Sequence, residues 1–338
     1  MPDAPTSMSK HVRPAPGPGF THGRVSAPAP LLDLPIAPIP AGARAEWFEG
    51  AGGLRLRAAL FPAETPRGTV VLSGGRTEFI EKYLEVITEL VGRGFTVLTH
   101  DWRGQGLSGR LLPDRLKGHA AGFGDFVADF GLLLDRYEGA APKPWIALSH
   151  SMGGCVAMTA LARGESRFSG AMFSSPMLGL KAQRSVAARA FVRGARLLGL
   201  TTAYVPPGAR DPFTATFQDD RLTHDEQRYD RTRAMILANP DLALGAVTFG
   251  WVDSAFETLR WLRGADYSGV AIPVLILGAG EENLVDNAGQ ALITGRIRGC
   301  RYEVIPGAFH ELLMERDDIR AVVWREFDAL AASISPSA

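Results

Sequence analysis

A serine near the middle of the chain has the surroundings of a catalytic nucleophile. The apolar residues 145–148 lead into Ser149-His150-Ser151-Met152-Gly153-Gly154, and a helical pattern follows over residues 155–162. A tight turn between a strand and a helix strains the backbone of the central serine and lifts its Oγ above the edge of the sheet. We therefore predict that Ser151 is the nucleophile. The N–H of Met152, at the start of the helix, would then face the charge that develops on an attacked carbonyl oxygen.

This motif departs from the usual G-x-S-x-G pattern at its first position, where Ser149 replaces glycine. The first position must be small because the strand and helix backbones pass close to each other there. Serine can fit, at some steric cost. An ordinary turn rich in serine and glycine is the alternative for this segment taken alone, so the prediction depends on the rest of the chain.

An activated serine needs a base, and the base should lie on a loop that follows a strand. His310 is the one of the seven histidines that follows a late strand: residues 302–305 have a strand pattern and residues 306–309 form a loop. We predict that His310 heads the next helix and acts as the base. The alternative is a histidine that only caps a helix or lies at the surface.

The base in turn needs an orienting carboxylate. The predicted strand over residues 274–277 runs into a loop that holds three acidic residues, Glu281, Glu282 and Asp286. We predict that Glu282 is the orienting acid, with Glu281 and Asp286 as rivals. Each of the three could also be an ordinary solvated loop charge.

The second oxyanion donor should come from the loop after the predicted strand 69–72. Gly74 and Gly75 let the backbone approach a substrate closely, and we predict that the N–H of Arg76 is the donor. The Arg76 side chain has two interpretations. We favour an ion pair with Glu78, and the alternative is a contact with a substrate phosphate.

The composition argues against several other function classes. Lys and Arg together number 36, as do Asp and Glu, so the charge balance gives no sign of a nucleic-acid partner. The two cysteines, Cys155 and Cys300, form no C-x-x-C pair, which favours a reducing, cytoplasmic compartment. Residues 104–109 spell G-x-G-x-x-G, but Pro113 and the lack of a following strand argue against a dinucleotide site. We expect no metal and no cofactor, and no apolar run is long enough to span a bilayer.

Short apolar segments alternate with helical patterns, which predicts an α/β fold whose mostly parallel sheet is covered by helices on both faces. Residues 46–61 have the pattern of a hairpin. Further strands are predicted over residues 69–72, 95–99, 145–148, 170–173, 272–277 and 302–305. Helices are predicted over residues 81–91, 123–137 and 318–332.

This pattern divides the chain into four predicted segments. Residues 1–42 are expected to form a disordered or loosely docked arm rich in proline and alanine. Residues 43–176 and 266–338 would form the two parts of the core. Residues 177–265 interrupt the alternation with helical patterns and many charges, and we predict that they form a cap over the carboxyl ends of the strands, where open α/β sheets bind ligands.

Four motifs together resemble the monoacylglycerol lipase and lysophospholipase branch of the α/β-hydrolases, and within it the bacterial lysophospholipases L2. They are Gly75-Arg76-Thr77-Glu78 with Tyr83, the block from Asp101 to Arg110, the Ser151 motif, and Ala308-Phe309-His310-Glu311. The resemblance covers about residues 45–335, and the Asp101 block is specific to the branch. It implies an α/β-hydrolase fold with a helical cap and a serine hydrolase that acts on single-acyl-chain lipids. By motif position it assigns the nucleophile to Ser151, the base to His310 and the acid to Glu282.

Two departures favour the lysophospholipase side. Eukaryotic monoacylglycerol lipases usually have aspartate at the Glu282 position and His-Gly at the position of Gly74-Gly75. Rival activities on this fold are a small-ester esterase, a thioesterase and an acyltransferase, and a more remote rival is a hydrolase-like protein that only binds a ligand. Residues 181–200 also have a basic amphipathic pattern, so the cap could contact an anionic membrane or simply pack on the core with its arginines solvated.

Overall fold

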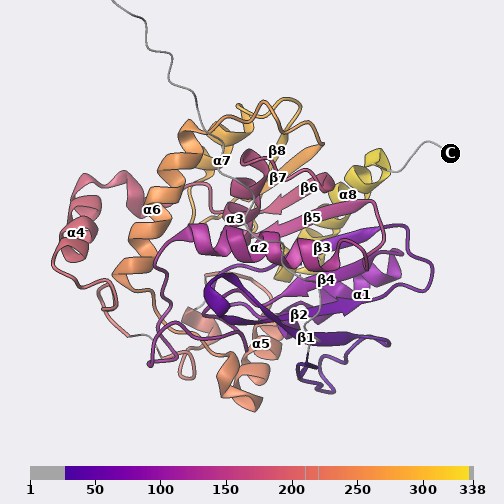
Figure 1. Ribbon diagram of the computed structural model, residues 1–338, viewed down its shortest axis with the longest axis horizontal. Coiled ribbons are helices and arrows are strands. Elements are labelled where there is room, and N and C mark those ends of the chain that lie inside the picture. The colour runs from indigo at the N-terminus through magenta and orange to yellow at the C-terminus, as the bar shows by residue number, and fades with distance from the viewer. Residues whose placement is uncertain (1–26, 210, 220, 335–338) are drawn as a thin grey trace, which may run out of the picture.

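The computed structural model describes residues 27–209, 211–219 and 221–334 of the chain. An eight-stranded sheet forms its centre, with the order β1-β2-β4-β3-β5-β6-β7-β8 (Figure 1). The strands are β1 (Arg44–Glu49), β2 (Arg55–Phe61), β3 (Thr69–Ser73), β4 (Thr96–His100), β5 (Trp145–His150), β6 (Phe168–Ser174), β7 (Val274–Ala279) and β8 (Arg301–Ile305). The hairpin β1–β2 is antiparallel, as is the pair β2–β4, whereas β3 to β8 are mutually parallel. The predicted mostly parallel sheet is therefore confirmed.

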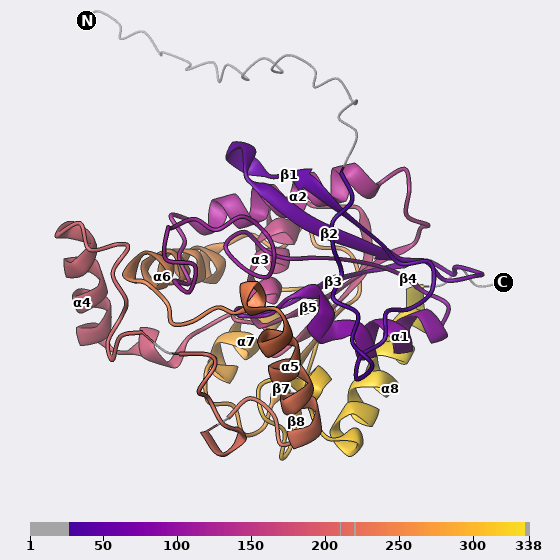
Figure 2. The same ribbon diagram turned by 90° about the horizontal axis from the view of Figure 1, so that it is seen from below.

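Helices cover both faces of the sheet (Figures 1 and 2). The α-helices are α1 (Leu84–Gly92), α2 (Phe123–Tyr137), α3 (Ser151–Ala162), α4 (Val186–Leu197), α5 (Glu226–Ala238), α6 (Phe249–Gly264), α7 (Asn287–Thr294) and α8 (Asp317–Ile334). Apolar residues of α2, α3 and α6 join one buried cluster, and those of α1 and α8 join the cluster on the opposite face. The inner strands β3 and β5 are buried along their whole length, as expected for parallel strands between two helical layers.

Two predicted helix starts differ from the structure. The predicted helix over residues 81–91 begins as a 3-10 turn, Ile80–Tyr83, before α1. All four residues of this turn are buried, so it is not the amphipathic first turn of a surface helix. The predicted helix at His310 is instead a loop with a short 3-10 turn, Leu312–Met314, and α8 begins only at Asp317.

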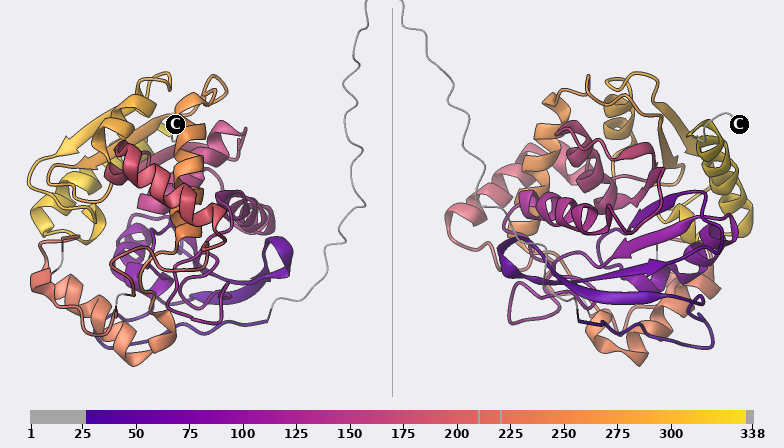
Figure 3. Two further views of the ribbon diagram at one scale, coloured as in Figure 1. Left: turned by 90° about the vertical axis from the view of Figure 1, so that its left-hand side faces the viewer. Right: turned by 45° about the vertical axis from the view of Figure 1, so that its right-hand side comes forward.

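The long segment between β6 and β7 contains α4, α5 and α6. Three backbone contacts join it to loops that follow other strands: Gly118 N–H donates to the Ala246 carbonyl, Asp286 N–H to that of Gly179, and Glu311 N–H to that of Leu222. The segment therefore lies at the carboxyl edge of the sheet. In Figures 1 to 3, α4 lies at one end of the molecule, against α6. The exact boundaries of a cap domain stay a prediction.

Part of the predicted arm lies along the sheet edge. Residues 1–26 fall outside the described residues. Farther on, Trp47 N–H donates to the Ala27 carbonyl and Ala29 N–H to the Ala45 carbonyl, both at 2.9 Å. The buried guanidinium of Arg57 donates to the Pro30 carbonyl at 2.9 Å. Residues 27–30 thus lie against β1 and β2.

Candidate active site

The three residues predicted to share a site meet at the carboxyl edge of the sheet. Ser151 follows β5, Glu282 lies on the loop after β7, and His310 lies on the loop after β8. The His310 Nε2 atom lies 2.8 Å from Ser151 Oγ, and its Nδ1 atom lies 2.7 Å from Glu282 Oε2. Both distances are within hydrogen-bond reach. Residues that are 28 and 159 positions from His310 in the chain therefore form one hydrogen-bonded line.

The serine has a strained backbone, as the motif predicts. Its φ angle is +48°, in the left-handed region that non-glycine residues rarely adopt. A close approach of α3 to β3 maintains the turn: a Cβ atom on Gly153 would lie 2.5 Å from the Gly74 carbonyl oxygen and 2.6 Å from that of Ser73. Ser149, which replaces the first glycine, fits inside the sheet, but its buried Oγ has no hydrogen-bond partner among the described residues. The neighbouring His150 contacts the Ser174 carbonyl through Nδ1 at 3.0 Å, and its ring centroid lies 4.8 Å from that of His310.

The three acidic residues of the loop after β7 have different surroundings. Glu282 is buried and faces His310. Asp286 caps α7 by accepting from the Ala288 N–H and pairs with Arg184 at 2.8 Å. The Glu281 side chain is 55% exposed. Of the three, Glu282 is therefore the residue in hydrogen-bond contact with His310.

The Glu282 carboxylate is held ionised by its partners. Burial alone would raise its pKa, but the hydrogen bond and charge of His310 lower it, as do the N–H groups of Leu284 and Val285, which donate to Oε1 at 2.8 and 3.2 Å. The net effect is a pKa below the ordinary value. An ionised carboxylate on Nδ1 keeps the proton of a neutral imidazole on that atom and leaves Nε2 free to accept one.

The loop after β3 lies beside Ser151. The Trp102 indole N–H donates to the Gly74 carbonyl at 2.7 Å, and Gly75 N–H donates to Glu78 Oε2. The next amide in the chain is that of Arg76. On the other side of the serine, Met152 lies in the first turn of α3, where backbone N–H groups have no acceptor within the helix.

Glu78 has partners other than the predicted one. Its carboxylate accepts from Gly75 N–H, from Lys82 Nζ at 2.9 Å and from the Tyr83 hydroxyl at 2.6 Å. Arg76 Nη1 instead donates to the Gly245 carbonyl at 2.8 Å. The favoured Arg76–Glu78 ion pair was therefore wrong, because the loop turns Glu78 inward and the guanidinium outward toward the β6–β7 segment.

The same buried region contains the one group of residues, among those described, whose donor atoms could hold a metal ion. Carboxylate oxygens of Glu78 and Glu311 and a ring nitrogen of His150 lie within 4.8 Å of one another. However, the Lys82 ammonium contacts both carboxylates, at 2.9 and 2.6 Å. A lysine side chain thus already supplies the positive charge that a metal would bring. Sequence reasoning missed this role of Lys82, although its neighbours Glu78, Tyr83 and Glu311 belong to the motifs quoted above.

The Asp101 block has a structural role. Asp101 accepts from the N–H groups of Ile80 and Leu107, at 2.9 and 2.8 Å, and from Arg57 Nε at 2.7 Å. A Cβ atom on Gly106 would lie 2.2 Å from the Asp101 carboxylate. This block therefore shapes the turn after β4, and Trp102 in it supports the loop of Gly74.

Comparisons with known proteins also point to a serine hydrolase. The Hydrolase_4 family, described as serine aminopeptidase, S33, matches residues 64–317. Lysophospholipase L2 of Escherichia coli K12 is 34% identical over 295 residues, which cover 81% of this chain and 83% of that protein. The chain belongs to the Hydrolase_4 family. Together these matches identify it as a serine ester hydrolase in the lysophospholipase and monoacylglycerol lipase branch of the α/β-hydrolases.

More distant relatives share the fold of this hydrolase. The monoacylglycerol lipase of Mycolicibacterium smegmatis is 27% identical over 79% of the chain and 90% of that protein. A soluble variant of the Saccharomyces cerevisiae monoglyceride lipase superimposes with a TM-score of 0.69 at 18% identity, over 91% of this chain and all of that one. At this identity the likeness shows the fold alone. Within the described residues no helix combines the length and apolarity needed to cross a bilayer.

Proposed function

We propose that this hydrolase cleaves the carboxylic ester of single-acyl-chain lipids, either lysophospholipids or monoacylglycerols, through an acyl-enzyme on Ser151. The observation that carries the proposal is the hydrogen-bonded line from Ser151 through His310 to Glu282. The substrate class is supported by relatives whose names state that they are lysophospholipases or monoacylglycerol lipases. Glutamate at position 282 and the pair Gly74-Gly75 favour the lysophospholipase side.

The reaction has two halves. In the first, His310 Nε2 takes the proton of Ser151 Oγ, which attacks the ester carbonyl while Glu282 holds the imidazole. The N–H groups of Arg76 and Met152 stabilise the oxyanion. His310 then protonates the leaving glycerol or glycerophospho-alcohol. In the second half, His310 activates a water molecule that cleaves the acyl-enzyme, and the fatty acid leaves with Ser151 restored.

A substitution of the nucleophile tests the chemical role. The Ser151→Ala variant should lose both labelling by a fluorophosphonate and ester hydrolysis, because it lacks the Oγ atom that contacts His310 Nε2. A lysophospholipid, a monoacylglycerol and a nitrophenyl butyrate should all be assayed with the wild type and the variant. Hydrolysis that persists in Ser151→Ala would exclude the acyl-enzyme on this residue.

A chain-length series tests the substrate class. We expect kcat/KM to rise with acyl length in both lipid series and to stay low for short nitrophenyl esters, since longer chains bury more apolar area, at about 0.8 kcal/mol per CH₂. Equal or better hydrolysis of short esters would favour the small-ester esterase instead. Amino-acid nitroanilides should be included because the family description names an aminopeptidase.

We further propose that the enzyme works in the cytoplasm in contact with the inner face of the membrane, through α4. The apolar side chains of Val186, Leu197 and Leu198 on or next to this helix are 70%, 78% and 77% exposed. Its polar face carries arginines, of which Arg196 pairs with Asp253 and Glu257. A basic amphipathic helix with an exposed apolar face is typical of contact with anionic lipid.

Co-sedimentation with vesicles tests this contact. The wild type should bind vesicles that contain phosphatidylglycerol more than neutral phosphatidylcholine vesicles, and salt should weaken the binding. Leu197→Ser together with Leu198→Ser should reduce binding, whereas Leu237→Ser, at a 52% exposed residue of α5, should not. Binding that depends on neither anionic lipid nor the α4 side chains would refute the proposal.

A further inference from the structure

A buried lysine joins the two loops that carry the proposed oxyanion donor and the proposed base. The Lys82 ammonium donates to Glu78 Oε1 at 2.9 Å and to Glu311 Oε1 at 2.6 Å. Glu78 lies on the loop after β3, and Glu311 directly follows His310 on the loop after β8. Lys82 and Glu311 are 229 positions apart in the chain. The bridge therefore links two parts of the active site that no local structure connects.

The other oxygen of Glu78 contacts the oxyanion loop itself. Oε2 accepts from Gly75 N–H and from the Tyr83 hydroxyl. Gly75 immediately precedes Arg76, so the Glu78 carboxylate anchors the loop one residue before the proposed oxyanion donor. A Cβ atom on Gly75 would lie 3.1 Å from this same Oε2 atom and 3.1 Å from Ser151 Cβ. The carboxylate thus fills the space directly beneath the loop.

All three charged groups of the bridge are buried. Their side chains are 7% exposed for Lys82, 2% for Glu78 and 11% for Glu311. Burial opposes ionisation of Glu78 and is the largest single effect on it. The charges of Lys82 and His150 and the hydrogen bonds from Tyr83 and Gly75 together outweigh burial and lower the pKa of Glu78 to about 2. The Glu78–Lys82 ion pair is therefore intact at neutral pH.

We propose that Lys82 is a positioning residue, whose ammonium holds the oxyanion loop and the histidine loop at the separation that the transition state requires. This inference rests on the proposed roles of Arg76, Ser151 and His310. Hydrogen bonds between charged partners are shorter and stronger than neutral ones, so a cation between two carboxylates forms a stiff link. Small displacements of an oxyanion donor or of the base reduce the rate strongly because catalysis depends on pre-set geometry.

Replacement of the ammonium by an apolar group of similar length tests the proposal. Lys82→Met should lower kcat by roughly 10- to 100-fold, less than the loss of a whole oxyanion donor, and should leave KM within about threefold. Turnover must be expressed per active site, counted with a fluorophosphonate, so that misfolded protein does not enter the result. A short nitrophenyl ester and a lysophospholipid should show the same loss, since both use the same oxyanion site.

The pH profile of this variant separates positioning from a general structural role. Without Lys82, the carboxyls of Glu78 and Glu311 lie next to each other with no cation between them. Two other groups contact or approach the Glu78 carboxylate: the Tyr83 hydroxyl, which donates to Oε2, and His150 Nε2, which lies 3.9 Å from Oε1. In the wild type, burial lowers the pKa of His150 to about 4, with the charge of Glu78 opposing this shift and that of Lys82 adding to it. Removal of Lys82 takes away one of the lowering causes, so in the variant His150 titrates together with the two carboxyls. Like charges raise the pKa of one carboxyl, and a shared proton can then replace the missing bridge. We expect kcat of Lys82→Met to fall as pH rises through that new pKa, a step that the wild type lacks.

Two more variants complete the experiment. Lys143→Met makes the same chemical change at a surface lysine, 57% exposed, and should keep the wild-type kcat. If Lys82→Met does not fold, Glu311→Gln weakens the same bridge without changing its shape and should lower kcat about three- to tenfold at unchanged KM. A wild-type kcat per titrated site in either bridge variant would overturn the proposal. Activity that persists in Ser151→Ala would instead overturn the proposed function, and the positioning role with it.

Discussion

At the scale of single residues, similar carboxylates in one loop do different things because their surroundings differ. Glu282 is buried against His310, Asp286 caps a helix, and Glu281 lies in solvent. A carboxylate on Nδ1 holds the imidazole in the tautomer that can accept a proton at Nε2. Of the three acidic residues, Glu282 is the one whose carboxylate contacts Nδ1 of His310.

An isosteric change tests the orienting acid. Glu282→Gln should lower kcat by roughly 10³- to 10⁴-fold with little change in fold, because an amide can turn its NH₂ group to Nδ1 and stabilise the wrong tautomer. Steady-state hydrolysis of a nitrophenyl ester measures the loss. Glu281→Gln makes the same change one residue earlier, at an exposed side chain, and should be neutral. A loss below about tenfold in Glu282→Gln would mean that another group orients His310.

At the scale of elements, the site depends on how closely α3 packs against β3. Gly153 is the contact point, since the backbone carbonyls of Ser73 and Gly74 occupy the space where a side chain would begin. Backbone atoms of a central strand cannot move aside as a flexible side chain can. The approach also brings Met152, at the start of α3, next to the loop of Arg76.

A single methyl group at this contact should separate the two elements. Gly153→Ala should lower the free energy of unfolding by about 3 kcal/mol, in the upper range for overpacked cores, and should reduce kcat as the Met152 N–H shifts. Urea unfolding and turnover per titrated site measure both effects. In Gly194→Ala, on α4, no described atom outside the backbone of the helix itself lies within 4 Å of the new methyl group. This change should be neutral or stabilising by up to about 1 kcal/mol. Equal stability of Gly153→Ala and the wild type would contradict the close approach.

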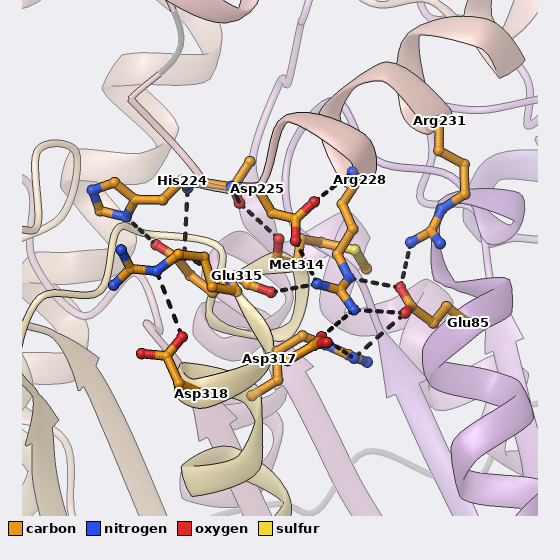
Figure 4. A network of polar contacts seen from close by, with 12 residues as sticks. Glu85, His224, Asp225, Arg228, Arg231, Met314, Glu315, Asp317 and Asp318 are labelled. Carbon is orange, nitrogen blue, oxygen red and sulfur yellow. Dashed lines mark hydrogen bonds and ion pairs between the residues drawn. The ribbon is translucent and has the colours of Figure 1, made fainter.

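At the scale of the whole molecule, ion pairs fasten α5 of the β6–β7 segment to the core (Figure 4). Arg228 contacts Glu85 of α1 at 2.8 Å and Asp317 of α8 at 2.6 Å, and Arg231 also contacts Glu85. Burial opposes ionisation of Glu85, but hydrogen bonds from both arginines and the charge of Arg320 lower its pKa to about 2. This pKa is lower in the folded chain than the ordinary value of 4.5, so ionised Glu85 stabilises the fold in full above about pH 4.5.

The stabilisation should disappear in acid. The free energy of unfolding should fall as pH decreases from about 4.5 to about 2, the window between the ordinary and the lowered pKa of Glu85. Glu85→Gln should be less stable than the wild type at neutral pH and should show a smaller decline over this window. Glu226→Gln, at an exposed residue of α5, serves as the matched control. Urea unfolding at several pH values provides the measurement, and parallel curves for the wild type and Glu85→Gln would refute the assignment.

The local sequence determined most of the elements and the candidates for chemistry. Alternation of short apolar runs and helical patterns predicted the parallel sheet, and the helix Phe123–Tyr137 has the predicted bounds. These patterns depend on neighbours a few positions apart, which is why they can be read from the chain. The positions after strands also singled out Ser151, His310 and the acidic loop, because parallel strands bring their carboxyl ends to one edge.

The tertiary structure decided which of these groups touch. Of the three acidic residues on the loop after β7, it placed Glu282 in contact with His310. It also directed the Glu78 carboxylate to Lys82 and not to Arg76. It also joined Lys82 to Glu311 across 229 positions. No local spacing encodes such contacts, because they depend on how far each loop bends and on which charges are buried together. The sequence therefore determined the kind of chemistry available, and the packing of distant loops determined the geometry in which it is held.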